Sequence, residues 1–425
     1  MARDTSIHEG PLDDIDLTDL DRFAGGFPHP VFARLRRDAP VHRHPPTAHT
    51  PDGEAFWVLS RHEHVLAAAS APDVFSSDGS AQRPTGGGTL IEDLAGGFAA
   101  GVLLNMMDDP RHQRIRKLVT PALAPRTLAL LEDDLRARTA ALVDSVAERG
   151  GCDFLVDVAA ELPLQAIARL LGVPQEDRHQ LFRWANASLD YDDRDLGESS
   201  EKAARASAEM FAYGTALIDD KRAAPADDLL SRVATATIPR ADGDGVAPLE
   251  DLEVQMFFNL LIAAGSETTR NSIAGGLLAL LDHPDQWRAL QADRGLLPTA
   301  VEEILRYTSS TTYNRRTATR AVEVGGRAIG AGDKVTLWWS SANHDEAVFP
   351  DPHRFDVARE PNRHLAFGHG THFCLGAALA RIEMRVVFDA LLERFDRLEP
   401  AGPPEWTRSN KHTGLRHLPV AVVPR

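Results

Sequence analysis

FGHGTHFCLG, residues 367–376, places three glycines around a single cysteine, Cys374, just ahead of a long helical pattern. Glycine adopts backbone conformations that other residues avoid, and it lets a flat ligand approach closely. The periodicity predicts a helix over Leu375–Phe395, so Cys374 would lie at its N-terminus. Unpaired N–H groups and positive potential there stabilise a thiolate. A thiolate among glycines suits one axial position of a haem iron.

This loop resembles the haem-binding loop of the cytochrome P450 family of haem-thiolate monooxygenases. The family pattern Phe-x-x-Gly-x-x-x-Cys-x-Gly is matched at every fixed position, and the Cys-x-x-Cys-His motif of covalent haem attachment is missing. The resemblance implies one haem b per chain, with Cys374 as the metal ligand and Phe367, Gly368 and Gly376 against the cofactor. The alternative, an inert structural or surface thiol, is the interpretation we favour for Cys152.

A second motif lies in the apolar stretch Leu249–Leu281, which predicts the central helix of a core. Glu267 and Thr268 are costly in such surroundings unless they are used, and a helical threonine can bond the carbonyl four residues earlier and loosen the helix. The segment Ala263–Thr269 resembles the family's Ala-Gly-x-Asp/Glu-Thr motif, which lies over the distal face of the haem. The resemblance implies that Thr268 hydrogen-bonds dioxygen or a water, that Glu267 relays protons and that Ala264 contacts the haem.

Four basic side chains are candidates for holding the haem propionates. His112 and Arg116 lie four residues apart and therefore share one face of a predicted helix. The resemblance assigns both to the propionates, together with Arg316 on a predicted strand and His372 two residues before the metal ligand. An ordinary solvated surface is the alternative for each of them.

Three other charges match family motifs that serve folding rather than chemistry. Glu303 and Arg306 lie three apart on one helix face, which taken alone would be a weak surface salt bridge. They match the family's Glu-x-x-Arg signature, and Arg359 matches the arginine of its Pro-x-x-Phe-x-x-x-Arg segment. The resemblance implies a buried structural network behind the haem.

The rest of the pattern predicts many helices and a few short strands. We expect a mainly α protein with a small β region, folded as a single cytochrome P450 domain over residues 1–425. Residues 1–28 would form an extension that is either packed on this domain or flexible. The haem would lie between the long central helix and the helix that follows the ligand loop. Strands are expected at Phe56–Leu59, Val322–Ile329 and Asp333–Trp338.

The composition is that of an ordinary globular protein, with 43% hydrophobic and 25% charged residues among 425. A net charge of −16 does not suit a general nucleic-acid binder. Two cysteines make no disulfide framework, and the N-terminus has no apolar core typical of a signal peptide. No stretch predicts a membrane span. We therefore expect a cytoplasmic protein without nucleic-acid or membrane partners.

The chain carries no fused flavin or iron–sulfur segment, so electrons would come from a partner. The resemblance implies a ferredoxin and its NAD(P)H-dependent reductase. A cationic patch beside the ligand loop would attract an acidic ferredoxin, although an ordinary charged helix surface is the alternative. The candidate cations are Arg111, Arg114, Arg116, Lys117, Arg381 and Arg385.

The expected reaction uses O2 to hydroxylate or epoxidise a small apolar organic substrate, in secondary metabolism or in terpenoid, steroid or fatty-acid oxidation. A polyketide, a carrier-bound aminoacyl group and oxidative coupling stay open as alternatives. The pocket would be lined by Leu260, Ala263, Thr312 and Asn314, with the loops at residues 80–103, including Phe98, and 189–198.

Two other classes of protein are alternatives to this interpretation. A non-catalytic haem-binding or sensing protein predicts loss of the acid–alcohol pair, which is present here as Glu267 and Thr268. A metal site made by Cys374 with His369 and His372 lacks the paired cysteines common in structural zinc sites.

Overall fold

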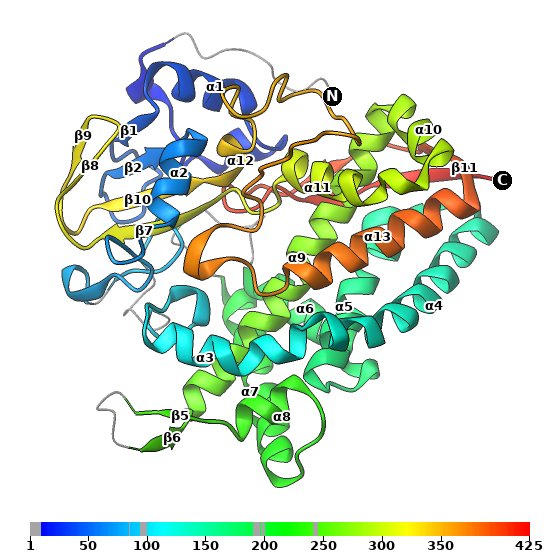
Figure 1. The fold of residues 1–425 in the computed structure, drawn as a ribbon, viewed down its shortest axis with the longest axis horizontal. Helices are drawn as coiled ribbons and strands as arrows, with labels where there is room; N and C mark the ends of the chain where they lie inside the picture. Colours follow the sequence, from blue (N-terminus) through cyan, green and yellow to red (C-terminus); the bar gives the residue numbers. More distant parts are fainter. Residues whose placement is uncertain (1–9, 85, 94–99, 190–195, 197–199, 241–244) are drawn as a thin grey trace.

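The apolar stretch around residue 265 forms α9, Asp251–Asp282, which runs through the middle of the molecule (Figure 1). A capping box between Glu250 and Glu253 satisfies N–H groups at its start. Apolar residues on several of its faces are buried, which explains why the helix has no single hydrophobic side. Pro284 begins the next helix, α10, directly after α9 ends.

Figure 1 shows a helical part packed around α9 and a smaller β part beside it. The structure is a computed structural model and describes residues 10–84, 86–93, 100–189, 196, 200–240 and 245–425. The other α-helices are α1 (His29–Asp38), α2 (His62–Ala69), α3 (Arg111–Val119), α4 (Pro125–Arg149), α5 (Glu161–Leu171), α6 (Arg178–Leu189), α7 (Glu201–Ala223), α8 (Leu229–Ala234), α10 (Pro284–Ala292), α11 (Leu297–Thr308), α12 (Trp339–Ala342) and α13 (Ala377–Arg394).

The β part is a five-stranded sheet with the order β1-β2-β10-β7-β3. Its β2 and β10 pair in parallel and the other neighbours are antiparallel. Smaller sheets pair β14 with both β11 and β4, β12 with β13, β5 with β6, and β8 with β9. The strands are β1 (Val41–His44), β2 (Phe56–Leu59), β3 (Phe75–Ser76), β4 (Gly151–Asp153), β5 (Thr237–Pro239), β6 (Val246–Pro248), β7 (Tyr313–Ala318), β8 (Val322–Val324), β9 (Arg327–Ile329), β10 (Lys334–Trp338), β11 (Phe395–Pro400), β12 (Glu405–Trp406), β13 (Leu415–His417) and β14 (Pro419–Pro424).

The strand predicted at Val322–Ile329 is two strands in the structure. Residues 322–329 make a hairpin, β8 and β9, instead of a single strand. Gly325 and Gly326 lie between the two short strands with φ of 55° and 75°. Such left-handed backbone reverses the chain, and glycine adopts it without steric cost.

The N-terminal segment packs on the sheet from residue 10 onward. Ile15, Leu17 and Phe23 are almost fully buried, and the Phe23 ring stacks on Trp338 of β10 at 6.2 Å. Residues 1–9 of the predicted extension lie outside the described residues. Within the part of the chain that is described, no helix is both long and apolar enough to cross a membrane.

Candidate active site

The loop around Cys374 is closed by its own backbone. The Cys374 N–H donates to the Phe367 carbonyl oxygen at 2.9 Å, and the Gly368 N–H donates to Leu365 at 2.9 Å. Gly368 and Gly370 have φ of 70° and 73°, so the motif glycines allow this turn. The helix that follows begins at Ala377, not at residue 375 as predicted, because Gly376 stands before it in a non-helical conformation.

The surroundings of the Cys374 sulfur act on its thiol in two opposite directions, and burial is the larger effect. Burial raises the pKa of the Cys374 thiol, whereas backbone N–H groups of Gly376 and Ala377 and the charges of Arg116 and Arg381 act to lower it. A bound cation would complete the deprotonation, since a coordinating thiol loses its proton outright. Cys374 would therefore become a thiolate through the bound cation, and the nearby N–H groups and arginines would help to stabilise it.

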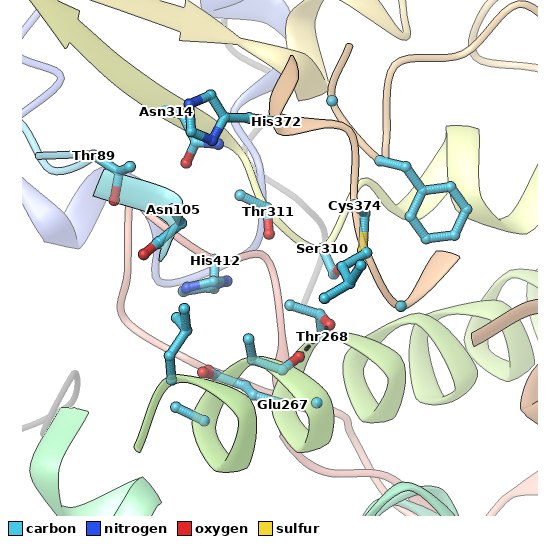
Figure 2. A pocket seen from close by; sticks show the side chains of 18 of the residues that line it. Thr89, Asn105, Glu267, Thr268, Ser310, Thr311, Asn314, His372, Cys374 and His412 are labelled. Atoms are coloured by element: carbon cyan, nitrogen blue, oxygen red, sulfur yellow. Dashed lines mark hydrogen bonds between the residues drawn. The ribbon is translucent and has the colours of Figure 1, made fainter. Parts of the chain in front are cut away.

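Cys374 and the motif of α9 line the same cavity, which has a volume of about 580 Å³. Figure 2 shows Cys374 facing α9, with Thr268 and Glu267 on the opposite wall. The Thr268 hydroxyl donates to the Ala264 carbonyl at 3.0 Å, yet α9 stays a regular α-helix here, without the loosening that the motif suggested. Glu267 is only 6% exposed, and its carboxylate lies 3.9 Å from the Arg270 guanidinium.

The four basic side chains expected at the propionates line this cavity together. The rings of His112 and His372 lie 4.2 Å apart between centroids, and Arg116 hydrogen-bonds the Phe373 carbonyl from the neighbouring helix α3. Burial, reinforced by the charges of Arg316, His112 and Arg116, lowers the pKa of His372 to about 2. His372 is therefore neutral at neutral pH, and the positive charge on this wall comes from Arg116 and Arg316.

These residues fit a haem. The thiol and Ala264 and Thr268 line one cavity from two sides, as an axial ligand and a distal helix require. A Cβ added to Gly376 would meet no atom within 4 Å, which leaves open space beside the sulfur. Two propionates would also supply the negative charge that the basic wall lacks. Phe367 and Gly368 line the same cavity.

Glu303, Arg306 and Arg359 form one buried network away from the cavity. Glu303 and Arg306 are 0% exposed and are joined by two hydrogen bonds of 2.7 and 2.9 Å. Arg359 donates to Glu303 at 3.1 Å, and Arg306 also donates to the carbonyls of Asn343 and Pro352. The network therefore ties α11 to two loops, in keeping with a structural role.

Three of the four predicted pocket residues line the cavity: Leu260, Ala263 and Asn314. Thr312 does not. It is fully buried, and its hydroxyl donates to the Asn410 carbonyl, so its side chain is directed into the protein. Its neighbour Thr311 lines the cavity instead. Phe98 and most of residues 189–198 lie outside the described residues.

Among the cavity residues that were not predicted, three ionisable side chains stand out: Lys411, His412 and Glu383. Lys411 is buried and its ammonium donates to the carbonyls of Thr89 and Tyr313 and to Asn314, at 2.7–3.0 Å. His412 lies above Glu267 in Figure 2. Glu383 of α13 is 2% exposed and faces α9 through a hydrogen bond with Thr269.

The predicted cationic surface is largely neutralised. Carboxylates pair with Arg111, Arg381 and Arg385, and Arg116 points toward the cavity. Lys117 is exposed, and Arg114 donates to a carbonyl oxygen at 3.1 Å. Only these two of the six candidates have neither a recorded carboxylate partner in the described structure nor a place on the cavity wall.

The alternative metal site at the ligand loop is not formed. In the described residues, Cys374, His369 and His372 do not bring their ligand atoms within 4.8 Å of one another. A group that does so lies elsewhere and comprises His29, His344 and His353.

Comparison with known proteins agrees with this site. The family model "Cytochrome P450" matches residues 151–421. Cytochrome P450 126 of Mycobacterium tuberculosis is 52% identical over 412 residues, 97% of this chain and 98% of the relative. The methyl-branched lipid omega-hydroxylase of the same organism is 40% identical over 97% of this chain and 95% of its own length. A cytochrome P450 of Mycobacterium marinum, solved in complex with pseudoionone, superposes with a TM-score of 0.87 at 34% identity, over 97% and 100% of the two chains.

The chain belongs to the cytochrome P450 family. It is a haem b monooxygenase with the mainly helical fold of that family, as the ligand loop and the α9 motif predicted.

Proposed function

We propose that this monooxygenase hydroxylates or epoxidises an apolar, branched or chain-like organic substrate bound beside α9. The observation that carries the proposal is the composition of the cavity wall. Its apolar lining includes Leu104, Ile167, Met210, Met256 and Leu260. The lipid hydroxylase named above, at 40% identity, favours the same substrate class.

The polar part of the cavity limits how such a substrate would lie. Asn105, Asn314 and Lys411 line it together with the buried acid Glu92. A substrate with one polar end would place that end here, because Asn105 and Asn314 lie on this side of the cavity, and would leave its apolar carbons toward α9 (Figure 2). The cavity also has to hold the haem, so its volume is not the volume of the substrate.

Haem ligated by Cys374 supplies the activation of O2 and the transfer of one oxygen atom to the substrate. We assign the delivery of protons to Glu267 and Thr268. The Thr268 hydroxyl donates to its own helix, so its oxygen lone pairs face the cavity and can accept a hydrogen bond from a water. Glu267, one residue away, is the nearest acid along α9 and can pass a proton to that water.

The electron donor that we propose is a small acidic ferredoxin with its NAD(P)H-dependent reductase. It would dock beside α3, since Arg116 of this helix contacts the ligand loop at Phe373. Arg114 and Lys117 then become the attracting charges, in place of the larger patch that the sequence suggested. Steering by these charges affects the association rate and weakens as salt increases.

The substrate proposal is tested by titrating the ferric enzyme with a panel of compounds. The panel contains a methyl-branched fatty acid, an acyclic terpenoid alcohol, a steroid and a hydrophilic amino acid. A substrate that displaces water from the iron shifts the Soret absorption, and we expect saturable shifts from one of the first two compounds. A shift with only the steroid or only the amino acid, or no shift with any of the four compounds, would contradict the proposal.

The docking proposal is tested with Arg114→Glu. We expect the KM for a ferredoxin to rise about tenfold at low salt and the difference to vanish as salt increases. Arg397→Glu is the matched control, because Arg397 is an exposed arginine on β11. Identical ferredoxin kinetics in Arg114→Glu and wild type would rule out docking at this surface.

A further inference from the structure

Three histidines far apart in the sequence meet at the junction of α1 with the loops around residues 344–353. His29 begins α1, His344 follows α12, and His353 lies in the loop beyond. Each offers one ligand nitrogen, and all three nitrogens lie within 4.8 Å of one another. No part of the haem site uses them, because none of the three lines its cavity. We propose that His29, His344 and His353 form a binding site for one zinc ion.

The tautomer of His344 suits metal ligation. Its Nδ1 lies 3.0 Å from the Ser340 carbonyl oxygen, and because a carbonyl can only accept, Nδ1 must carry the proton. The lone pair of Nε2 is therefore left for a ligand. Metal-binding histidines characteristically donate their other N–H to a carbonyl or carboxylate, which fixes the ring. His344 is 1% exposed, so this orientation is also held by packing.

The spacing of the rings is close to that of three ligands on one ion. Ring centroids are separated by 4.2 Å for His29–His344, 5.3 Å for His29–His353 and 5.5 Å for His344–His353. Tetrahedral ligation at about 2.0–2.1 Å places ligand nitrogens about 3.3 Å apart, so the donors need to close by at most about 1.5 Å. His353 is exposed, and a small movement of its side chain can supply that closure.

The charges near the histidines do not oppose a cation strongly. Arg306 and Arg36 are the nearby guanidinium groups. Arg306 is neutralised by Glu303, and Arg36 makes two hydrogen bonds of 2.7 and 3.0 Å to Glu346. Imidazole nitrogen is a preferred ligand of zinc, and the exposed side at His353 leaves the fourth position to water.

A zinc ion here would link the N-terminal helix to the structural network. His344 follows Asn343 and His353 follows Pro352, whose carbonyl oxygens both accept from Arg306 at 2.9 Å. The ion would thus fix the two loop positions that hold Arg306 to the N-terminal helix α1. We expect a stabilising site, because its three ligands come from distant segments that only the folded chain brings together.

The experiment uses the haem-loaded enzyme, stripped with a chelator, incubated with zinc chloride and desalted. Elemental analysis then gives the ratio of zinc to iron. Because each folded chain binds one haem, the iron content measures the number of folded chains. We expect one zinc per iron in wild type, and less than about a tenth of that in His353→Ala and His353→Gln, since zinc would keep only two of its three protein ligands. His179→Ala removes an equally accessible histidine from α6 and is expected to keep one zinc.

The thermal transition gives a second measurement on the same samples. Zinc is expected to raise the melting temperature of wild type and of His179→Ala, and to leave both His353 variants unchanged. Wild type without bound zinc, or full zinc content in the His353 variants, would overturn the site and leave three imidazoles in tilted and edge-on ring contacts. An unaltered reduced-carbon-monoxide spectrum in His353→Gln shows that loss of zinc is not loss of fold.

Discussion

The Thr268 hydroxyl donates to the Ala264 carbonyl oxygen at 3.0 Å, so the alcohol that faces the sulfur of Cys374 across the cavity is oriented by its own helix. This bond uses the only hydroxyl proton and leaves the oxygen lone pairs as acceptors. The orientation predicts that Thr268 acts by holding a water through its hydroxyl oxygen. A side chain of the same shape without a hydroxyl would therefore not replace it.

Thr268→Val keeps the branched shape and removes the hydroxyl. We expect the product formed per NAD(P)H consumed to fall about tenfold or more, with hydrogen peroxide appearing instead. Thr268→Ser is expected to recover most of the product yield because it restores the hydroxyl. Equal yields from the valine and serine variants would remove Thr268 from proton delivery.

Glu267→Gln tests the acid of the same motif. We expect kcat to fall about 100-fold, a usual contribution of a positioned acid, with little change in substrate affinity. The variant should also show a larger solvent isotope effect on kcat, which a purely structural substitution would not produce. A wild-type isotope effect together with a wild-type kcat would show that protons enter by another route.

Arg306→Ala breaks the buried network at its centre. Its loss leaves the Glu303 carboxylate buried without its main partner, which costs about 3–5 kcal/mol in the free energy of unfolding. Chemical denaturation followed by haem absorbance measures this change. Arg397→Ala is the control, since exposed pairs contribute about 1 kcal/mol or less. A loss in Arg306→Ala no larger than that of the control would contradict the structural assignment.

Glu383 predicts a pH dependence of stability. Burial raises the pKa of Glu383 to about 8 from its ordinary value of 4.5. The folded chain therefore holds this proton between about pH 4.5 and 8 while the unfolded chain has lost it, and the stabilisation from it is lost as pH rises through that window.

Glu383→Gln cannot titrate at this position. Its free energy of unfolding, relative to wild type, is expected to rise between pH 5 and 9 by at most about 1.4 kcal/mol per pH unit. Denaturation curves at four pH values give the slope. Parallel stability profiles for the two proteins would show that Glu383 has no raised pKa.

The ligand loop and α9 could be predicted because each is a continuous motif whose chemistry is local. The direction of the Thr312 side chain could not be predicted. It depends on how residues 311–313 pack against the C-terminal segment, where Thr311 forms a β-bridge with His412. The pairing of the surface arginines with carboxylates could not be predicted for the same reason. Arg385, for example, donates to Glu132, which lies 253 residues away in the sequence. Glu383 could not be predicted, since its burial and its contact with Thr269 depend on how α13 packs against α9.

The central claim is that Cys374 ligates the haem as a thiolate. The most direct test is the absorption spectrum of the purified, dithionite-reduced protein under carbon monoxide. We predict a Soret band at the long wavelength typical of thiolate-bound haem in wild type, and its loss in Cys374→His. A short-wavelength band in the freshly purified wild-type protein, or a long-wavelength band that persists in Cys374→His, would contradict the assignment.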